Sequence, residues 1–290
     1  MGRIRARHLA AFLAGVLAMG VLAAWVVGSQ LGASVNRSVP LPTGFSAKLV
    51  SIPGPGYAIA GWWLDQGADS PVVLLLHAVR ADRSSMLPRA SLLAGRGFSV
   101  LLIDLQGHGE TPGATITFGL RESADVRAAH AWLRHVAPSR KIGVIGCSLG
   151  GAAVLLGTQP SGFDAIVLEA VYPRIGNAVE NRIRIRLGPL ASAVAPVLLA
   201  QLPLRLQISP SDLEPIRSIG RVGAPVLVVA GSRDEHTTLA ESEDLFRAAV
   251  EPKRLWIVSG ARHQDFLSFD PAGYESHVVG FLVEHLRPVA

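Results

Sequence analysis

The chain alternates short runs of apolar residues with longer segments in which apolar positions recur at helical spacing. Continuous runs rich in Val, Leu and Ile, such as residues 72–76, are typical of parallel strands buried on both faces of a sheet. Because strand and helix alternate, the pattern predicts an α/β domain with a mostly parallel sheet and helices on both faces. The eight predicted strands cover residues 46–51, 57–64, 72–76, 98–103, 141–146, 165–169, 225–230 and 254–259, and the main helices lie near residues 84–96, 120–135, 239–250 and 272–286.

The longest apolar run, Leu9 to Val27, contains no charged residue and follows Arg3, Arg5 and Arg7. At about 1.5 Å per residue, this run just crosses a hydrocarbon core of about 30 Å. The arginines that precede it predict a cytoplasmic N-terminus and a domain on the outer, extracytoplasmic side of the membrane. We therefore expect a signal anchor over residues 1–28 that spans the membrane through residues 9–27. The alternative is a signal peptide whose cleavage would release a secreted protein.

Two further segments depart from the strand–helix alternation. Residues 29–44 contain glycine, serine and two prolines, which predicts a linker ahead of a domain over residues 45–290. Residues 172–221 form an insertion that is rich in arginine at first and then, over residues 190–206, almost free of charge. This insertion is expected to be a small helical lid over the carboxyl ends of the strands; the alternative is an ordinary apolar helix packed on the core.

Composition excludes several classes of protein. The formal charge is +5, and the three arginines near the N-terminus leave only +2 for the rest of the chain. That balance, without interleaved aromatic and basic residues, does not indicate nucleic-acid binding. A single cysteine, Cys147, excludes an intramolecular disulfide framework and a cysteine-based zinc site, and we expect it to be a small packing residue.

The run Gly146-Cys147-Ser148-Leu149-Gly150 follows a predicted strand and precedes a helix-forming segment. This context is the one that a nucleophile elbow requires, in which a serine hydroxyl is exposed on a strained turn between strand and helix. Glycines two positions before and after the serine let the crossing backbones approach without a Cβ between them. The alternative is a glycine-rich turn without chemistry.

An activated serine needs a base within hydrogen-bond reach and a carboxylate that orients the base. Asp234 and His263 follow two later predicted strands, in the chain order nucleophile, acid, histidine. Because parallel strands end at a common edge, we expect Asp234 and His263 to meet Ser148 there. The alternatives are Glu235 for the acid, Asp265 or Asp270 as the group that orients the histidine, and His236 for the base. The histidines at 108, 130, 135, 277 and 285 are interpreted as structural or surface groups.

An oxyanion hole needs two backbone N–H groups directed at the developing negative oxygen. One is expected from Leu149, at the N-terminus of the helix that follows the serine, where the helix dipole helps. The second is expected from the loop after residues 72–76, with Val79 as the candidate and Ala78 as the reserve.

The chain resembles the α/β-hydrolase superfamily, and within it the bacterial serine aminopeptidase-like and prolyl-oligopeptidase-like branch. The resemblance covers residues 46–286. It rests on Leu74-Leu75-Leu76-His77, Asp104-Leu105-Gln106-Gly107-His108-Gly109-Glu110-Thr111, Gly146-Cys147-Ser148-Leu149-Gly150-Gly151, Gly231-Ser232-Arg233-Asp234 and Ala261-Arg262-His263. The family usually has His-Gly where this chain has His77-Ala78, so a Cβ could shift the oxyanion loop. The resemblance implies structural roles for His77 and His108.

The expected function is that of a membrane-tethered serine hydrolase that cleaves carboxylic esters through an acyl-serine intermediate, with no metal or cofactor. Its partners would be a small acyl ester or amide substrate and the membrane, with no nucleic acid. The alternatives are a serine (amino)peptidase, a thioesterase or an acyltransferase on the same triad. From another class, the alternative is a catalytically silent, membrane-anchored binding module.

Overall fold

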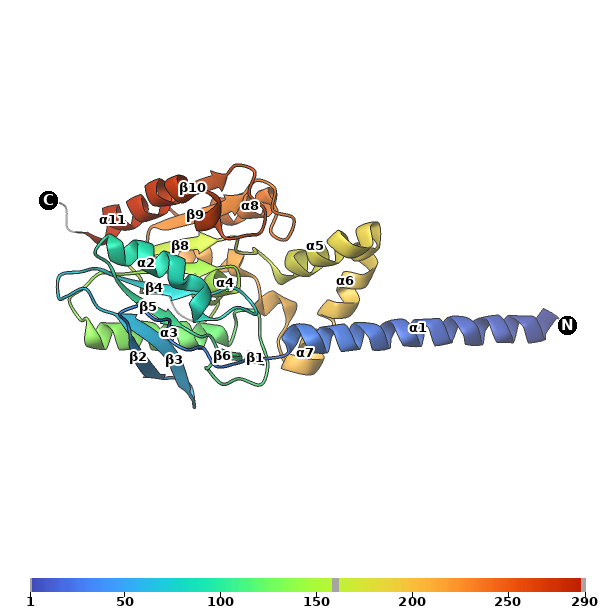
Figure 1. The fold of residues 1–290 in the computed structure, drawn as a ribbon. Coiled ribbons are helices and arrows are strands. Elements are labelled where there is room, and N and C mark those ends of the chain that lie inside the picture. Colours follow the sequence, from blue (N-terminus) through green and yellow to red (C-terminus); the bar gives the residue numbers. More distant parts are fainter. Residues whose placement is uncertain (1, 158–161, 288–290) are drawn as a thin grey trace.

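The computed structural model describes residues 2–157 and 162–287 (Figure 1). Eight strands form one sheet in the order β10-β9-β8-β7-β4-β5-β3-β2. β3 runs antiparallel to β2 and β5, and every other neighbouring pair in this sheet is parallel. This confirms the mostly parallel eight-stranded sheet. The strands are β2 (Lys48–Pro53), β3 (Ala58–Leu64), β4 (Val72–Leu76), β5 (Ser99–Ile103), β7 (Ile142–Cys147), β8 (Ala165–Glu169), β9 (Val226–Gly231) and β10 (Lys253–Val258).

Helices cover both faces of the sheet because side chains alternate along each strand. Along β4, Val72, Leu74 and Leu76 pack in the core layer that contains α3 and α4, whereas Val73 and Leu75 pack in the layer that contains α2 and the C-terminal helices. The sheet is therefore buried on both faces. The helices are α2 (Leu87–Gly95), α3 (Glu122–Val136), α4 (Leu149–Leu155), α8 (Leu239–Ala248), α9 (Phe266–Phe269), α10 (Pro271–Tyr274) and α11 (Gly280–Leu286).

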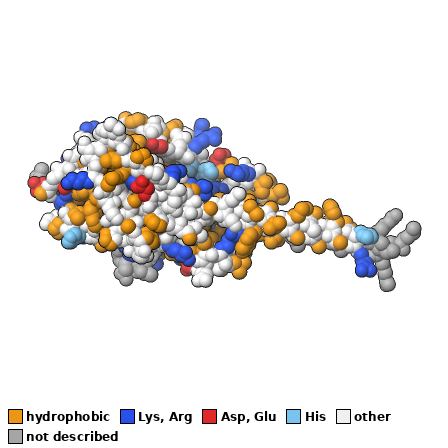
Figure 2. Space-filling model, turned by 60° about the horizontal axis from the view of Figure 1, so that its bottom comes forward, with side chains coloured by type: hydrophobic (Ala, Val, Ile, Leu, Met, Phe, Trp, Pro, Cys, Tyr) orange, Lys and Arg blue, Asp and Glu red, His pale blue; other side chains and the backbone are white. Residues whose placement is uncertain are grey.

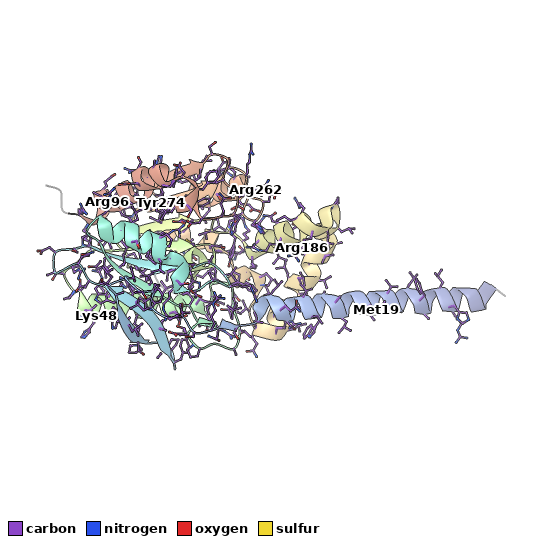
Figure 3. All side chains as sticks on the ribbon, in the orientation of Figure 1. Met19, Lys48, Arg96, Arg186, Arg262 and Tyr274 are labelled. Carbon is purple, nitrogen blue, oxygen red and sulfur yellow. The ribbon has the colours of Figure 1, made fainter. Side chains whose placement is uncertain are left out.

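The N-terminal helix α1 (Gly2–Gly32) projects from the domain, as Figure 1 shows. Apolar side chains are exposed along it, among them Phe12 and Met19 (Figures 2 and 3). The helix ends four residues beyond the predicted anchor. The next residues are held on the domain: β1 (Val35–Asn36) pairs with β6 (His108–Gly109). Residues 29–44 therefore differ from the predicted linker. Met1 of the anchor and residues 288–290 of the domain lie outside the described residues.

The insertion after β8 is helical. It consists of α5 (Ile175–Leu187), α6 (Ala191–Leu199) and α7 (Gln201–Leu206), with a short turn at Gly188–Leu190 between the first two. α5 and α6 pack against each other as a hairpin that projects on the same side of the domain as α1 (Figure 1).

Two stretches, Arg7–Gly32 and Ile175–Leu206, are long and apolar enough to cross a membrane by length and composition alone. The second folds back on itself at the α5–α6 turn. Neither of its longer helices, at about 1.5 Å per residue, reaches the thickness of a bilayer core of about 30 Å.

Candidate active site

Ser148 lies at the end of β7 with φ of 48° and ψ of −107°, a backbone conformation that non-glycine residues rarely adopt. A hydrogen bond from its backbone N–H to the carbonyl of Glu169, at 2.8 Å, holds this turn against β8. Its side chain is nearly buried, with 7% of the residue exposed. This is the conformation that the sequence pattern predicts for a nucleophile elbow.

The glycines around Ser148 are required by crowding. A Cβ on Gly146 would lie 2.5 Å from the backbone of Gly151, and one on Gly150 would lie 2.6 Å from the carbonyl oxygen of Leu76. A Cβ on Gly151 would lie 2.2 Å from the side chain of Val171. The strand and the helix of the elbow therefore cross at a distance that only glycine allows.

Asp234 and His263 meet as predicted. Asp234 Oδ2 accepts a hydrogen bond from His263 Nδ1 at 2.7 Å. Asp234 Oδ1 accepts from the backbone N–H groups of His236 and Thr237 at 2.7 and 2.9 Å, so the carboxylate is fixed in orientation. Since Nδ1 donates to the carboxylate, Nε2 of a neutral ring is left unprotonated as a candidate base.

The structure does not join the Ser148 hydroxyl to this pair. Within residues 2–157 and 162–287, neither Ser148 Oγ nor His263 Nε2 makes a hydrogen bond to a protein group. Without bound substrate, such bonds are often long, so this geometry leaves both groups available to a substrate.

The alternative residues have other partners. Glu235 is exposed and lies 3.8 Å from Arg262, while Asp265 and Asp270 accept backbone N–H groups at the starts of α9 and α10. The ring of His236 lies 5.0 Å from that of His263, between centroids, and its Nδ1 is buried without a partner among the described residues.

Gly231 allows the close approach of the loop that carries Asp234 to the loop that carries His263. A Cβ on Gly231 would lie 2.6 Å from the carbonyl oxygen of Ala261 and 2.9 Å from that of Arg262. The loops are also joined by a hydrogen bond from the N–H of Arg233 to the carbonyl of Ala261, at 2.8 Å. In the sequence, this glycine is indicated by the pattern Gly-Ser-Arg-Asp directly after a predicted strand.

The loop after β4 is organised by His77, which is fully buried. Its Nε2 accepts the N–H of Leu105 at 3.1 Å, so Nδ1 carries the proton and donates to the carbonyl of Ala78 at 2.8 Å. Burial lowers the pKa of His77 to about 3, which keeps the ring neutral. The Ala78 carbonyl also accepts the N–H of Ala81. In a trans peptide, C=O and N–H point in opposite directions, so the N–H of Val79 is turned away from His77.

Both predicted oxyanion donors are free. Among the described residues, neither the N–H of Leu149 nor that of Val79 donates to a protein acceptor. Leu149 is the first residue of α4, whose N-terminal amide groups have no partner within the helix. The structure thus leaves two N–H groups, from two loops, without a protein acceptor at the end of the sheet where Ser148 lies.

A buried charged network lies beneath the elbow, and the sequence analysis missed it. Glu169, at the end of β8, accepts from Arg89 Nη2 at 2.6 Å, from Tyr274 Oη at 2.6 Å and from Cys147 Sγ at 3.2 Å. Arg89 also contacts Asp265 of the histidine loop at 2.8 Å. Burial raises the pKa of the Cys147 thiol well above its usual range, which is consistent with the packing role expected for this cysteine. In the sequence, this network is indicated only by an acidic residue, Glu169, at the end of a predicted apolar strand.

The helical insertion is hydrogen-bonded to the loop that carries Asp234. Asn181 of α5 donates from Nδ2 to the carbonyl of His236 at 3.2 Å and to the carboxylate of Glu241 at 2.8 and 2.9 Å. Arg182, the next residue, is half-buried. Burial lowers its pKa, and the nearby charge of Asp234 opposes that effect. The insertion therefore places the positive charge of Arg182 near Asp234.

This sheet order, with an elbow serine and an Asp–His pair at the ends of parallel strands, defines the class of the protein: an α/β hydrolase. The comparisons narrow the class. Residues 68–220 match the family described as serine aminopeptidase, S33. An uncharacterized protein of Mycobacterium tuberculosis is 36% identical over 72% of this chain and 69% of its own length. The uncharacterized YqkD of Bacillus subtilis is 24% identical over 78% of this chain and 76% of its own length. The chain belongs to this hydrolase family.

Solved structures share the fold. An esterase of Pyrococcus furiosus superposes with a TM-score of 0.70 at 23% identity, over 88% of this chain and 99% of the esterase. An acylaminoacyl peptidase of Pyrococcus horikoshii gives a TM-score of 0.64 at 16% identity, over 86% of this chain and 43% of the peptidase. Both esterases and peptidases are thus built on this architecture.

Proposed function

We propose that this chain is a membrane-tethered serine hydrolase that cleaves carboxylic esters through an acyl-Ser148 intermediate. The observation that carries the proposal is the strained Ser148 at the same sheet edge as the Asp234–His263 hydrogen bond. In the proposed reaction, His263 Nε2 takes the proton of the Ser148 hydroxyl as Oγ attacks the ester carbonyl. Asp234 holds the histidine tautomer and stabilises the imidazolium that forms.

The negative charge that develops on the carbonyl oxygen would be bound by the N–H groups of Leu149 and Val79. His263 then donates its proton to the alcohol as the C–O bond breaks, and the acyl group remains on Ser148. Water, deprotonated by the same histidine, attacks the acyl-serine and releases the carboxylic acid.

The charges near the site favour an ester over a peptide with a free N-terminus. An aminopeptidase binds the substrate ammonium with a carboxylate. The two acids closest in sequence after Asp234 have other partners, since Glu235 lies beside Arg262 and Glu241 accepts from Asn181. Arg182, close to Asp234, would repel an ammonium group.

Fluorophosphonate labelling of the full-length protein in detergent tests the proposal. We expect labelling of the wild type that is lost in Ser148→Ala and weakened in His263→Ala. Ser51→Ala, an exposed serine on β2, is the matched control and should label fully. A folded wild type that never labels would show a binding module rather than an enzyme. Cleavage of aminoacyl arylamides far faster than of any p-nitrophenyl ester would replace the esterase with a peptidase.

A further inference from the structure

A cavity of about 490 Å³ lies between α1, the lid and the loop at residues 114–118. This volume is within the range of about 300–1,000 Å³ that is usual for small-molecule sites. Its wall is mostly apolar, with Phe118 from the loop, Ile175 and Val179 from α5, and Leu199 and Leu202 from the later lid helices. The last turns of α1, from Trp25 to Gly32, line one side of it. An apolar cavity of this kind accepts a hydrocarbon chain.

Side chains of α7 hold α1 where it borders the cavity. Arg205 of α7 lies over the ring of Trp25, 3.7 Å from its centroid, and donates to the hydroxyl of Ser29 at 2.5 Å. Gln201 donates to the carbonyl of Ala24 at 3.0 Å. A Cβ on Gly28 would lie 2.2 Å from Gln201 Oε1, so glycine allows this close approach.

The residues directly after α1 are hydrogen-bonded to the domain. The N–H of Ile116 donates to the carbonyl of Gly32, and the N–H of Val35 donates to that of Gly107, at 2.8 and 2.7 Å. Asn36 Nδ2 donates to the carbonyl of Thr111 at 2.7 Å. These contacts set the orientation of α1 relative to the domain. That orientation determines how the cavity would face a membrane spanned by α1.

Helix length places the cavity at the membrane surface. If the hydrocarbon core begins near Leu9, about 20 residues of helix cross it, so it ends near residue 28, within the cavity wall. Trp25 and Arg205 are residue types that favour such an interface. The turn of the lid hairpin, on the same side of the domain, exposes Leu187 and Leu190, and Arg186 lies beside them (Figures 1 and 3).

The loop that lines the inner side of the cavity is linked to elements around the candidate active site. Tyr172, three residues after β8, donates its hydroxyl to the carbonyl of Phe118 at 2.6 Å. The neighbouring Gly119 packs on α4, where a Cβ would lie 3.0 Å from that of Ala152. The cavity is thus bounded by α1 on one side and, on the other, by a loop whose next residue contacts α4 of the elbow.

We propose that this cavity is an acyl-chain site, and that the substrate is a long-chain ester whose hydrocarbon tail enters from the adjoining leaflet of the membrane. The proposal rests on the proposed serine hydrolase function and names its substrate class. Water-soluble short-chain esters would reach Ser148 without using the cavity.

Val179→Trp in the full-length protein, reconstituted in phosphatidylcholine vesicles, tests this assignment. The larger side chain fills part of the cavity, so kcat/KM for p-nitrophenyl palmitate should fall at least tenfold while that for p-nitrophenyl acetate stays within twofold. Val197→Trp is the matched control: it makes the same substitution on α6 at an exposed position outside the cavity wall and should change neither rate. Val179→Phe, a smaller change, takes its place if Val179→Trp fails to fold.

Each outcome separates the two proposals. Selective loss of palmitate hydrolysis supports the acyl-chain site. Equal loss of both rates, no loss of either, or a wild type that labels with fluorophosphonate but does not hydrolyse palmitate overturns the site and leaves the serine hydrolase intact. A wild type that neither labels nor hydrolyses any ester overturns the proposed function itself.

Discussion

Replacing Gly146 by alanine tests whether crowding at the elbow holds Ser148 in place. The added Cβ would lie 2.5 Å from both Cα and N of Gly151. Ordinary contact begins at 3.4 Å, so strand β7 and helix α4 must separate by about 0.9 Å. Because the φ of Gly146 is not positive, alanine can adopt the backbone conformation, and the effect is one of space alone.

A displacement of about 1 Å at the reacting group costs about 100-fold in rate, which is the fall in kcat/KM that we expect for Gly146→Ala. Overpacking of the buried crossing should also lower the free energy of unfolding by about 1–3 kcal/mol. The assays are p-nitrophenyl ester hydrolysis and thermal unfolding of the full-length protein in detergent.

Gly280→Ala is the matched control. Gly280 begins α11 with helical angles, φ −55° and ψ −46°, and a Cβ there meets nothing within 4 Å. This variant should keep its activity and gain about 0.4–1 kcal/mol of stability, because alanine restricts the unfolded chain. The reasoning is refuted if Gly146→Ala hydrolyses esters at the wild-type rate, or if it loses stability without losing kcat/KM.

Two further predictions concern buried charges. Arg89→Met leaves the Glu169 carboxylate buried without its cation and should lower the free energy of unfolding by about 3–5 kcal/mol. In denaturant unfolding, the double variant Arg89→Met/Glu169→Leu should recover most of this loss. Equal losses in the single and double variants would contradict the coupling of the two charges. Burial raises the pKa of Asp125 to about 7. Protonated Asp125 therefore stabilises the folded state. This contribution to the free energy of unfolding is fully present below the pKa of Asp in the unfolded chain and is lost as the pH rises towards 7, by up to about 4 kcal/mol. In thermal unfolding at pH 5 and pH 8, Asp125→Asn should show a smaller difference in stability between the two pH values than the wild type. Asp69→Asn, at an exposed control position, should show the wild-type difference.

The sheet and the three proposed reacting residues were predictable because each depends on local pattern. Parallel strands such as β4 are buried on both faces and read as unbroken apolar runs. Ser148, Asp234 and His263 each follow such a run, and parallel strands bring their carboxyl ends to one edge. The Asp234–His263 hydrogen bond is confirmed by geometry, and the catalytic roles remain predictions.

Other features depend on partners far away in the chain. Residues 29–44 have the composition of a linker, yet β1 pairs with β6 more than 70 positions later through contacts that no local pattern reveals. Glu169 was only a strand-ending acid in the sequence, because its partner Arg89 is 80 positions away. The direction of the Val79 N–H likewise depends on the tautomer of His77, which the distant Leu105 determines.

Glu169 belongs to both groups of features: it ends a strand that the local pattern predicts, and its partners are distant in the chain. It supports the turn of Ser148 and the loop that carries His263. Its carbonyl holds the N–H of Ser148, whose conformation costs free energy that the surroundings must supply. Its carboxylate holds Arg89, which in turn contacts Asp265, two residues beyond His263. Glu169 therefore links the turn of Ser148, through its carbonyl, to the loop that carries His263, through its ion pair with Arg89.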